Sequence, residues 1–262
     1  MDQPQLTAHQ FGATAANYLT SAVHAKGADL DRISQVAARM HGPRVLDLGS
    51  GAGHASFAAA RGGALRVVAY DLSPDMLAVV AAEAARRGHS AIETVSGPAE
   101  RLPFADASFE LIVTRFSAHH WLELARALAE AARVLIPGGT MIVIDVLAPE
   151  APLLDTALQT LEFLRDGSHV RNYRESEWRA MLAAAQFSEP TTVKGEIDRW
   201  KLPLEFQSWV TRIGTPAGRI DALKVVLDAL PREAREYFAV TQDYGFSIDS
   251  GWIEVRKPIS AP

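Results

Sequence analysis

A glycine-rich segment between a predicted strand and a predicted helix constrains the fold more than any other part of this chain. The apolar run RVLDLG (44–49) is typical of a strand, and HASFAAAR (54–61) is typical of a helix. Gly49, Gly51 and Gly53 lie at the connection. Glycine adopts backbone conformations that other residues avoid, and it lets a ligand approach the main chain closely. The segment therefore predicts a strand–turn–helix unit whose turn faces a ligand.

Short β-rich runs alternate with alanine-rich helical runs after this unit, which is typical of βαβ units and a mostly parallel sheet. The predicted strands are 44–49, 65–71, 91–97, 109–116, 140–147, 191–202 and 251–257. The helix over 74–87 has the clearest ends, with Ser73 as N-cap, Pro74 at the first helical position and Gly88 just past the last turn. The sequence predicts a doubly wound α/β fold.

The regular alternation stops after Pro149. A helix followed by a polar loop fits 153–173, another helix fits 176–185, and helical patterns fill 203–240. We interpret these segments as helical lid insertions, because they interrupt the sheet without adding long β-rich runs.

Composition narrows the class of protein. The chain has 262 residues, 48% of them hydrophobic and 22% charged, which suffices for a sizeable core. A net charge of −5 argues against nucleic acid as a partner, since such binding needs clustered Lys and Arg. Cysteine is absent, and Asp145 and Pro149 interrupt the apolar run of the last core strand. We predict a cytoplasmic protein without a membrane span.

The charge around the glycine turn indicates the kind of ligand. A dinucleotide-binding turn has the spacing GxGxxG, but His54 occupies the position of the last glycine. Asp47, directly before the turn, would also repel a pyrophosphate. S-adenosylmethionine carries an ammonium and a sulfonium, plus a carboxylate that backbone N–H groups at a helix N-terminus can hold. The loop therefore favours S-adenosylmethionine over a nicotinamide dinucleotide.

Asp71 closes the second predicted strand. A carboxylate there can accept hydrogen bonds from both ribose hydroxyls. The alternative is helix capping, which a neighbouring serine provides more directly. Leu72 and Met76 either pack against the adenine or belong to the core. After the third strand, a backbone N–H at Ala99 or Glu100 would meet the adenine edge.

Four segments of the chain carry a family resemblance: VLDLGSGAGHAS, YDLSPDML, GPAERLPFADASFELIV and ARVLIPGG. Together they resemble the class I S-adenosylmethionine-dependent methyltransferases, in particular the bacterial group related to ubiquinone and menaquinone C-methyltransferases. The resemblance implies a seven-stranded sheet of the Rossmann-like methyltransferase kind, with helices on both faces and an antiparallel last strand at 251–257. It also implies methyl transfer from S-adenosylmethionine to a small-molecule acceptor.

The predicted cofactor site combines residues argued above with residues that the resemblance implies. It comprises Asp47, Gly49, Ser50, Gly51, Gly53, Asp71, Leu72, Met76, Ala99, Glu100 and Arg115. Relatives often have Asp at the position of Pro98, where it contacts the adenine amino group. Proline has no side-chain acceptor, so this contact is lost or replaced. The N-terminal motif of the quinone methyltransferases is not evident, which leaves the acceptor unnamed.

We expect a single domain in three parts: an N-terminal helical cap over the cofactor (1–40), a cofactor-binding core (41–149), and the rest of the sheet with the substrate lid (150–262). In the cap, Phe11, Tyr18 and His24 lie on a predicted helix. An aromatic ring there can face the sulfonium, and Tyr18 is the best candidate. The alternative is an amphipathic helix that only packs on the sheet.

The turn after the fourth strand supplies the other catalytic candidates. Methyl transfer needs an acceptor held at attack distance with water excluded, and a histidine base helps with an amine, thiol or phenol. His119 and His120 would lie at the carboxyl edge of the sheet, where ligands bind. The alternative is that one caps a helix and the other is exposed. We assign no metal, because no further ligand has convincing spacing.

The substrate-binding candidates come from the lid, together with the residue after the fourth strand. They are Phe116, Arg165, His169, Arg171, Tyr173, Trp209 and Arg212. Arginine forks suit carboxylates, so the arginines would fit an anionic or carbonyl-rich acceptor; solvated surface charge is the alternative. Trp209 and Arg212 share a helix face and either complete the pocket or, for Trp209, belong to the core.

Two other functions are weighed against this one. A nicotinamide-dependent oxidoreductase is opposed by His54 and by the acid before the glycine loop. A non-catalytic S-adenosylmethionine-binding protein is compatible with the sequence, because a fold does not fix a function. A homodimer is one assembly that such a chain could form.

Overall fold

The structure is a computed structural model that describes residues 1–12, 27–188 and 197–259. The strands are β1 Arg44–Leu48, β2 Arg66–Asp71, β3 Ile92–Ser96, β4 Phe109–Arg115, β5 Leu135–Ala148, β6 Tyr173–Arg174, β7 Asp198–Leu204 and β8 Phe246–Arg256. The helices are α1 Gln3–Gly12, α4 Ala28–Arg39, α5 His54–Arg61, α6 Pro74–Arg87, α7 Leu124–Val134, α8 Pro152–Arg165, α9 Glu175–Ala184, α10 Phe206–Arg212, α11 Ala217–Ala229 and α12 Arg232–Tyr237.

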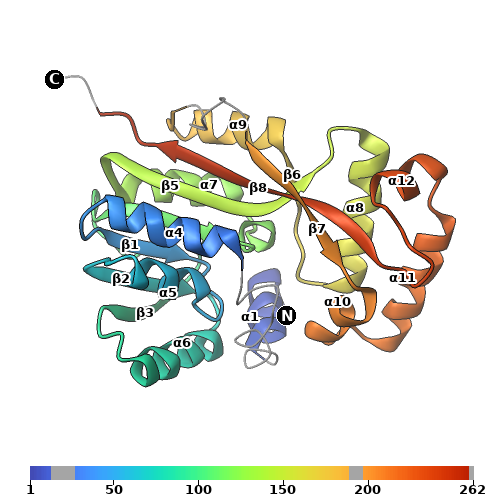
Figure 1. Cartoon of the computed structure of the whole chain (residues 1–262), viewed down its shortest axis with the longest axis horizontal. Coiled ribbons are helices and arrows are strands. Elements are labelled where there is room, and N and C mark those ends of the chain that lie inside the picture. Colours follow the sequence, from blue (N-terminus) through green and yellow to red (C-terminus); the bar gives the residue numbers. More distant parts are fainter. Residues whose placement is uncertain (13–26, 189–196, 260–262) are drawn as a thin grey trace.

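The sheet has eight strands within the described residues, in the order β3-β2-β1-β4-β5-β8-β7, with the short β6 beside β5 (Figure 1). β1 to β5 are parallel, whereas β8 runs antiparallel to β5 and β7. The predicted doubly wound, mostly parallel sheet with an antiparallel last strand is confirmed, but the two-residue β6 adds an eighth strand to the seven that were expected. The strand order reverses between β1 and β4. Ligands of open α/β sheets bind at the carboxyl ends of the strands beside such a reversal.

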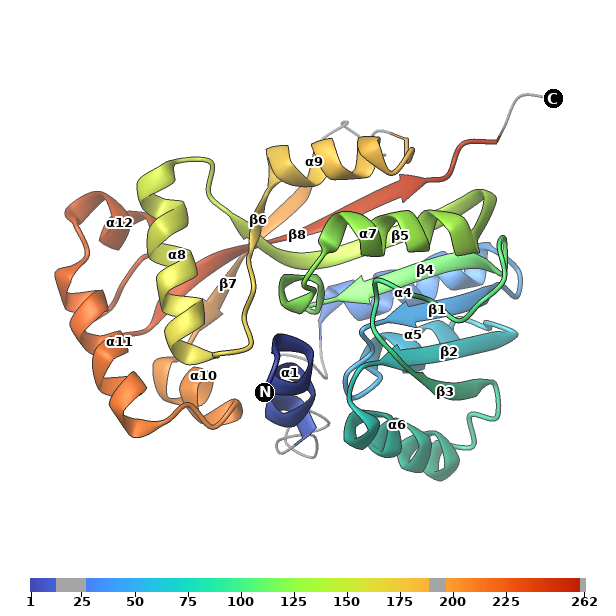
Figure 2. The same cartoon turned by 180° about the vertical axis from the view of Figure 1, so that it is seen from behind.

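Helices cover both faces of the sheet because its strands are apolar on both sides (Figure 2). Successive side chains of a strand point to opposite faces. Val45 and Ile142 therefore pack with α4 and α5 on one face, while Leu46 and Val143 pack with α7 and α9 on the other. These two cores fix the ends of β1 and β4, from which the glycine loop and the histidine turn emerge.

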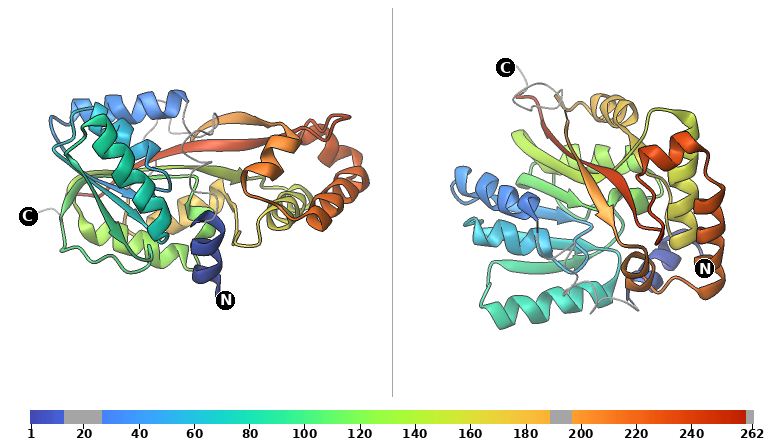
Figure 3. Two further views of the ribbon diagram at one scale, coloured as in Figure 1. Left: turned by 90° about the horizontal axis from the view of Figure 1, so that it is seen from below. Right: turned by 45° about the vertical axis from the view of Figure 1, so that its right-hand side comes forward.

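Four helices after β5, namely α8, α10, α11 and α12, pack together on the extended ends of β5, β7 and β8, and we call this cluster the lid. The helix α9, which was also expected in the lid, packs with α7 on the sheet instead. The apolar core of the lid joins Val146 of β5 and Ile248 of β8 to Leu158, Trp209 and Leu227 of the helices. Figure 3 shows this lid from two further directions, at the end of the sheet away from β3. No helix in the described parts of the chain is long and apolar enough to cross a membrane.

Several element boundaries differ from the sequence-based expectation. β5 begins at Leu135, so the PGG segment expected as a turn lies inside the strand, at an irregularity in its register with β4. The helical region 203–240 divides into three helices, two of which directly follow Pro216 and Pro231. Proline lacks the N–H that would continue a preceding helix. The helix α1 was not expected, and the N-terminal helix predicted to carry Phe11, Tyr18 and His24 falls mostly on residues 13–26, which lie outside the described residues.

The end signals predicted for α6 are confirmed. Ser73 Oγ accepts a hydrogen bond from the Met76 N–H at 3.3 Å, and Gly88 ends the helix with φ of 72°. Replacing Ser73 with alanine should lower the free energy of unfolding by about 1 kcal/mol, the usual cost of a lost N-cap. Urea denaturation measures this change. Ser90→Ala, at an exposed turn residue, is the control and should leave the midpoint unchanged; equal midpoints for both variants would contradict the capping role.

Candidate active site

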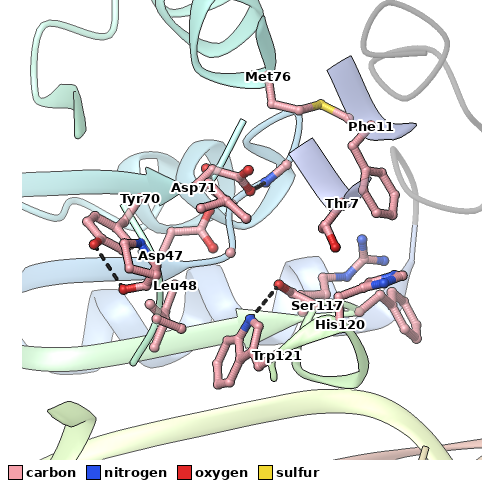
Figure 4. A pocket seen from close by; sticks show the side chains of 18 of the residues that line it. Thr7, Phe11, Asp47, Leu48, Tyr70, Asp71, Met76, Ser117, His120 and Trp121 are labelled. Carbon is pink, nitrogen blue, oxygen red and sulfur yellow. Dashed lines mark hydrogen bonds between the residues drawn. The ribbon is translucent and has the colours of Figure 1, made fainter. Parts of the chain in front are cut away.

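A cavity opens at the carboxyl ends of β1, β2 and β4, beside the reversal of strand order (Figure 4). Its walls come from the glycine loop, the end of β2, the segment after β3, the turn after β4 and one side of α1. The lining residues that were predicted to bind the cofactor are Asp47, Gly49, Ser50, Gly51, Asp71, Leu72, Met76, Ala99, Glu100 and Arg115. Gly53 is not among the lining residues. A Cβ there would lie 2.9 Å from a methyl of Val80, so its small size allows α6 to pack closely.

The glycine loop adopts a backbone conformation that side chains resist. The angle φ is +74° at Gly49 and +50° at Gly51. A Cβ on Gly49 would overlap the Ser117 hydroxyl, whereas a Cβ on Gly51 meets no atom within 4 Å. Since Gly51 also lines the cavity, a side chain there would compete with a ligand for space.

Asp71 joins the glycine loop to the start of α6. Its Oδ2 accepts a hydrogen bond from the Gly51 N–H at 2.8 Å, and its Oδ1 accepts one from the Ser73 N–H at 2.8 Å. Burial raises the pKa of the Asp71 carboxyl, and these backbone donors oppose the rise. A carboxylate has about four acceptor positions, so this one retains capacity for ligand hydroxyls.

Asp47 places a second carboxylate at the cavity. Its Oδ2 accepts hydrogen bonds from the backbone N–H of Ser56 at 2.8 Å and from the hydroxyl of Ser56 at 2.6 Å. Burial raises the pKa of Asp47 to about 6, although the bonds from Ser56 oppose that shift. A nearby cation favours the charged form of a buried carboxyl. This part of the cavity therefore suits a ligand with a positive charge.

The other lining residues of this cavity also match the chemical groups of S-adenosylmethionine. Leu48, Ala52, Met76 and Ala99 are apolar and line the cavity. The hydroxyl of Ser50 is buried and has no hydrogen-bond partner among the described residues. Such an atom is uncommon in a folded protein unless a ligand or water meets it. Two carboxylates, an unpartnered hydroxyl and apolar walls fit a nucleoside with a cationic amino-acid end.

Helix α1 closes one side of the cavity. Gln3, Thr7 and Phe11 recur at helical spacing and line it. Nε2 of Gln3 donates hydrogen bonds to the carbonyl oxygens of His120 at 2.9 Å and Ser168 at 3.0 Å. α1 thereby connects the turn after β4 with the loop after α8.

A second, smaller cavity lies between the first cavity and the lid. Its lining residues are Phe11, Phe116, His119, His120, Val146, Glu162, Arg165, Leu202, Leu204, Trp209, Arg212 and Ile248. Phe11, Phe116 and His120 line both cavities. The rings of Phe11 and His120 meet edge to face with centroids 4.8 Å apart. The two cavities therefore meet at these aromatic rings.

His119 is held by an acid inside the sheet. Its Nδ1 lies 2.6 Å from Oδ1 of Asp145, a buried residue of β5. Burial lowers the pKa of His119, but the charge and hydrogen bond of Asp145, with the charges of Glu162 and Asp166, outweigh burial and leave the pKa raised. When Nδ1–H donates to Asp145, the opposite nitrogen Nε2 carries a lone pair. His119 can therefore accept a proton in the second cavity.

Two further histidines beside His119 are held neutral. His120 has its Nδ1 3.2 Å from the Ser168 carbonyl oxygen, and burial together with the charge of His119 lowers its pKa to about 4. His169 has its Nε2 3.0 Å from Oε1 of Gln159, and burial followed by the charges of His119 and His120 lowers its pKa further. His119 is thus the member of this cluster whose pKa is raised, whereas the pKa values of the other two are lowered.

Comparison with known proteins decides the family. A family model described as a methyltransferase domain matches residues 46–143. The uncharacterized methyltransferase YcgJ of Bacillus subtilis is 37% identical over 231 residues, which cover 88% of this chain and 89% of YcgJ. The chain belongs to the S-adenosylmethionine-dependent methyltransferases.

Other relatives of this methyltransferase agree with that membership. The crystal structure of YcgJ matches with a TM-score of 0.80 at 33% identity, covering 87% of this chain and 98% of that one. The uncharacterized protein YafE of Escherichia coli K12 is 44% identical over 191 residues, which are 73% of this chain and 90% of YafE. A demethylmenaquinone methyltransferase of Chlorobaculum parvum is 37% identical over 112 residues, 43% of this chain and 44% of the relative. The predicted resemblance to the menaquinone group is confirmed.

The methyltransferase lid brings only some of the predicted substrate residues to a cavity. Arg165, Trp209 and Arg212 line the second cavity, and Trp209 also packs in the apolar core of the lid. His169, Arg171 and Tyr173 line neither of the two cavities described above, and the His169 imidazole is hydrogen-bonded to Gln159. Tyr18, the predicted catalytic tyrosine, lies outside the described residues.

Ion pairs and ring packing explain why Arg171 and Tyr173 lie elsewhere. The Arg171 guanidinium lies 3.0 Å from the Asp155 carboxylate and 3.1 Å from that of Glu177. The ring of Tyr173 packs edge to face against Trp178, with centroids 5.8 Å apart. Both residues hold the chain between α8 and α9 in place.

Two predicted cofactor residues of the methyltransferase have partners inside the protein. Arg115 forms a largely buried ion pair with Asp29 of α4. The Glu100 carboxylate accepts hydrogen bonds from the N–H groups of Leu122 at 2.9 Å and Glu123 at 3.2 Å. Both residues line the cavity while they fix its walls. In the described part of the chain, no group of three or more acidic or histidine residues is arranged to hold a metal ion.

Proposed function

We propose that S-adenosylmethionine binds in the first cavity and that a small-molecule methyl acceptor binds in the second. The observation that carries this proposal is the shared lining: Phe11, Phe116 and His120 belong to both cavities. A methyl group at this junction would face an acceptor on the other side. When bound, S-adenosylmethionine supplies an electrophilic methyl group on a positively charged sulfur.

The residues of the first cavity have distinct roles in this proposal. Asp47 faces the ammonium of the cofactor, because it is the buried carboxylate near the carboxyl end of β1. Asp71 accepts hydrogen bonds from the ribose hydroxyls while Gly51 and Ser73 hold its position. Met76 and its apolar neighbours cover the adenine. With Pro98 unable to accept through a side chain, the backbone after β3 meets the adenine edge.

Water exclusion falls to α1 and the lid in this proposal. Gln3 fixes α1 to the turn after β4, and Phe11 covers the junction of the cavities. Methyl transfer between positioned partners needs close approach more than strong acid or base chemistry. Helix α1 therefore contributes by holding the junction closed.

Cofactor affinity should depend on pH through Asp47. Its pKa in the protein alone is about 6, so below that pH the carboxyl is neutral and no longer attracts an ammonium. We expect affinity for S-adenosylhomocysteine to fall by up to about tenfold for each pH unit below about 6. Calorimetry between about pH 5 and 8 measures this. Asp47→Asn should bind more weakly and with a flatter pH dependence; a wild-type affinity independent of pH would contradict the role.

A crystal structure with S-adenosylhomocysteine tests the placement directly. The proposal predicts ligand density along the glycine loop, with the ribose at Asp71 and the sulfur at the rings of Phe116 and His120. Density elsewhere, or a sulfur facing away from the second cavity, would contradict the proposal.

A further inference from the structure

The second cavity combines aromatic and aliphatic walls with charged and titratable side chains. Phe11, Phe116 and Trp209 contribute aromatic rings, and Val146 and Ile248 are among the aliphatic residues. Aromatic rings pack favourably against one another in stacked or edge-to-face arrangements. A planar ring compound matches these walls better than a flexible polar chain.

Three side chains that line this space can take up a proton, namely His119, His120 and Glu162, and among them His119 is hydrogen-bonded to the buried carboxylate of Asp145. Among the histidines of the described chain, His119 and His120 line the second cavity, and His120 is engaged through Nδ1 with the Ser168 carbonyl. The Nδ1 of His119 is engaged with Asp145, which leaves Nε2 on the other side of the ring. Asp145 Oδ1 also accepts the Val146 N–H at 2.8 Å, so the carboxylate is fixed within β5. Asp145 thereby orients the imidazole and favours its charged form after proton uptake.

The charges around the cavity discriminate between acceptors. Arg165 and Arg212 line it, and Arg165 lies 3.5 Å from Glu162, the acidic residue of the lining. Asp145 lies 2.6 Å from His119 and Asp166 lies 3.8 Å from His120, and neither acid is a lining residue. The lining carries two guanidinium groups and one carboxylate. This excess of positive charge repels an ammonium and attracts an oxyanion. The cavity thus favours an acceptor that becomes an anion over one that is a cation.

We propose that the acceptor is an aromatic compound whose ring hydroxyl is methylated, with His119 as the base and Asp145 as its positioning residue. This inference rests on the proposed function, because it requires the cofactor methyl at the cavity junction. The aromatic walls hold the ring, Nε2 of His119 receives the hydroxyl proton, and the arginines stabilise the oxyanion.

The transfer step conserves atoms and charge. The hydroxyl proton moves to His119 Nε2, and an oxygen lone pair forms the new O–CH3 bond as the C–S bond breaks. The electron pair of the broken bond stays on sulfur, which changes from a sulfonium to a neutral thioether. The products are an aryl methyl ether, S-adenosylhomocysteine and a proton on His119 that passes to solvent.

The test uses 4-nitrophenol as the probe, because its anion absorbs visible light and reports its own ionisation. Its apparent pKa is titrated with the wild type, with and without saturating S-adenosylhomocysteine. We expect the bound probe to ionise at least about one pH unit below the free probe, because an imidazolium and two arginines stabilise the anion. The uncharged isostere 4-nitroaniline should bind at least about tenfold more weakly.

Two variants make the assignment specific. His119→Gln and Asp145→Asn should return the bound probe to its ordinary ionisation, while the affinity for S-adenosylhomocysteine stays unchanged. Asp106→Asn, at an exposed acid that pairs with Arg133 and lines neither cavity, is the control and should behave as the wild type. Absence of 4-nitrophenol binding, binding only in neutral form, or equal affinity for 4-nitroaniline would overturn the inference. Failure of S-adenosylhomocysteine to bind would instead contradict the proposed cofactor site, since the probe is titrated without it as well.

Discussion

Replacing Asp71 with alanine should weaken the binding of S-adenosylmethionine by about a hundredfold or more. In our account the carboxylate accepts hydrogen bonds from two ribose hydroxyls, and bonds to a charged group contribute about 1.5–3 kcal/mol each. The substitution also removes the acceptor that holds the Gly51 N–H at 2.8 Å, so the loop loses its tie to β2. Isothermal calorimetry measures the change.

Two further variants separate a specific contact from general damage. Asp75→Ala removes an exposed acid four residues later and should leave the affinity within about twofold of the wild type. Gly51→Val adds a side chain in the left-handed region at a cavity wall and should abolish binding. Equal affinities for the Asp71 and Asp75 variants would show that Asp71 does not contact the cofactor.

His119→Gln should slow methyl transfer to 4-nitrophenol by about a hundredfold to ten-thousandfold, the usual contribution of a general base. Glutamine keeps a polar side chain of similar reach but cannot take up a proton. S-adenosylhomocysteine binding should be unchanged, because His119 does not line the first cavity. The rate is measured from the loss of visible absorbance as the probe is converted to its methyl ether. An unaltered kcat would show that His119 is not the base.

The pH profile distinguishes a base from a structural histidine. The imidazole accepts a proton only when neutral, so kcat should rise with pH through the pKa of His119. Burial lowers that pKa, but Asp145 outweighs burial and raises it above its ordinary value. Asp145→Asn removes the carboxylate charge, so the inflection of kcat should move to lower pH while its plateau falls. A lower plateau with an unmoved inflection would indicate a structural role only.

Local signals made much of the first cavity predictable. The glycines before α5 and the acid at the end of β2 are recognised from residues close together in the sequence. Parallel strands then bring these positions to the same edge of the sheet. The end signals of α6 are equally local, since Ser73, Pro74 and Gly88 act within one or two turns of the helix.

Residues that act through distant contacts could not be predicted. Asp145 interrupts an apolar strand, which is a signal for a buried acid, but its partner His119 lies 26 positions away in sequence. Nothing in the sequence distinguishes Gln3 and Thr7 from other polar residues, and only the packing of α1 brings them to the cavity. The sequence could not separate Arg171 from Arg165, because both are arginines of the same region. The acids of α8 and α9 that pair with Arg171 come close to it only through tertiary packing.

Calorimetric titration of the wild type with S-adenosylmethionine and, separately, with NADH tests the central claim most directly. The account predicts micromolar binding of S-adenosylmethionine and no measurable binding of NADH, because Asp47 attracts an ammonium and repels a pyrophosphate. Preference for NADH, or no binding of S-adenosylmethionine, would contradict it.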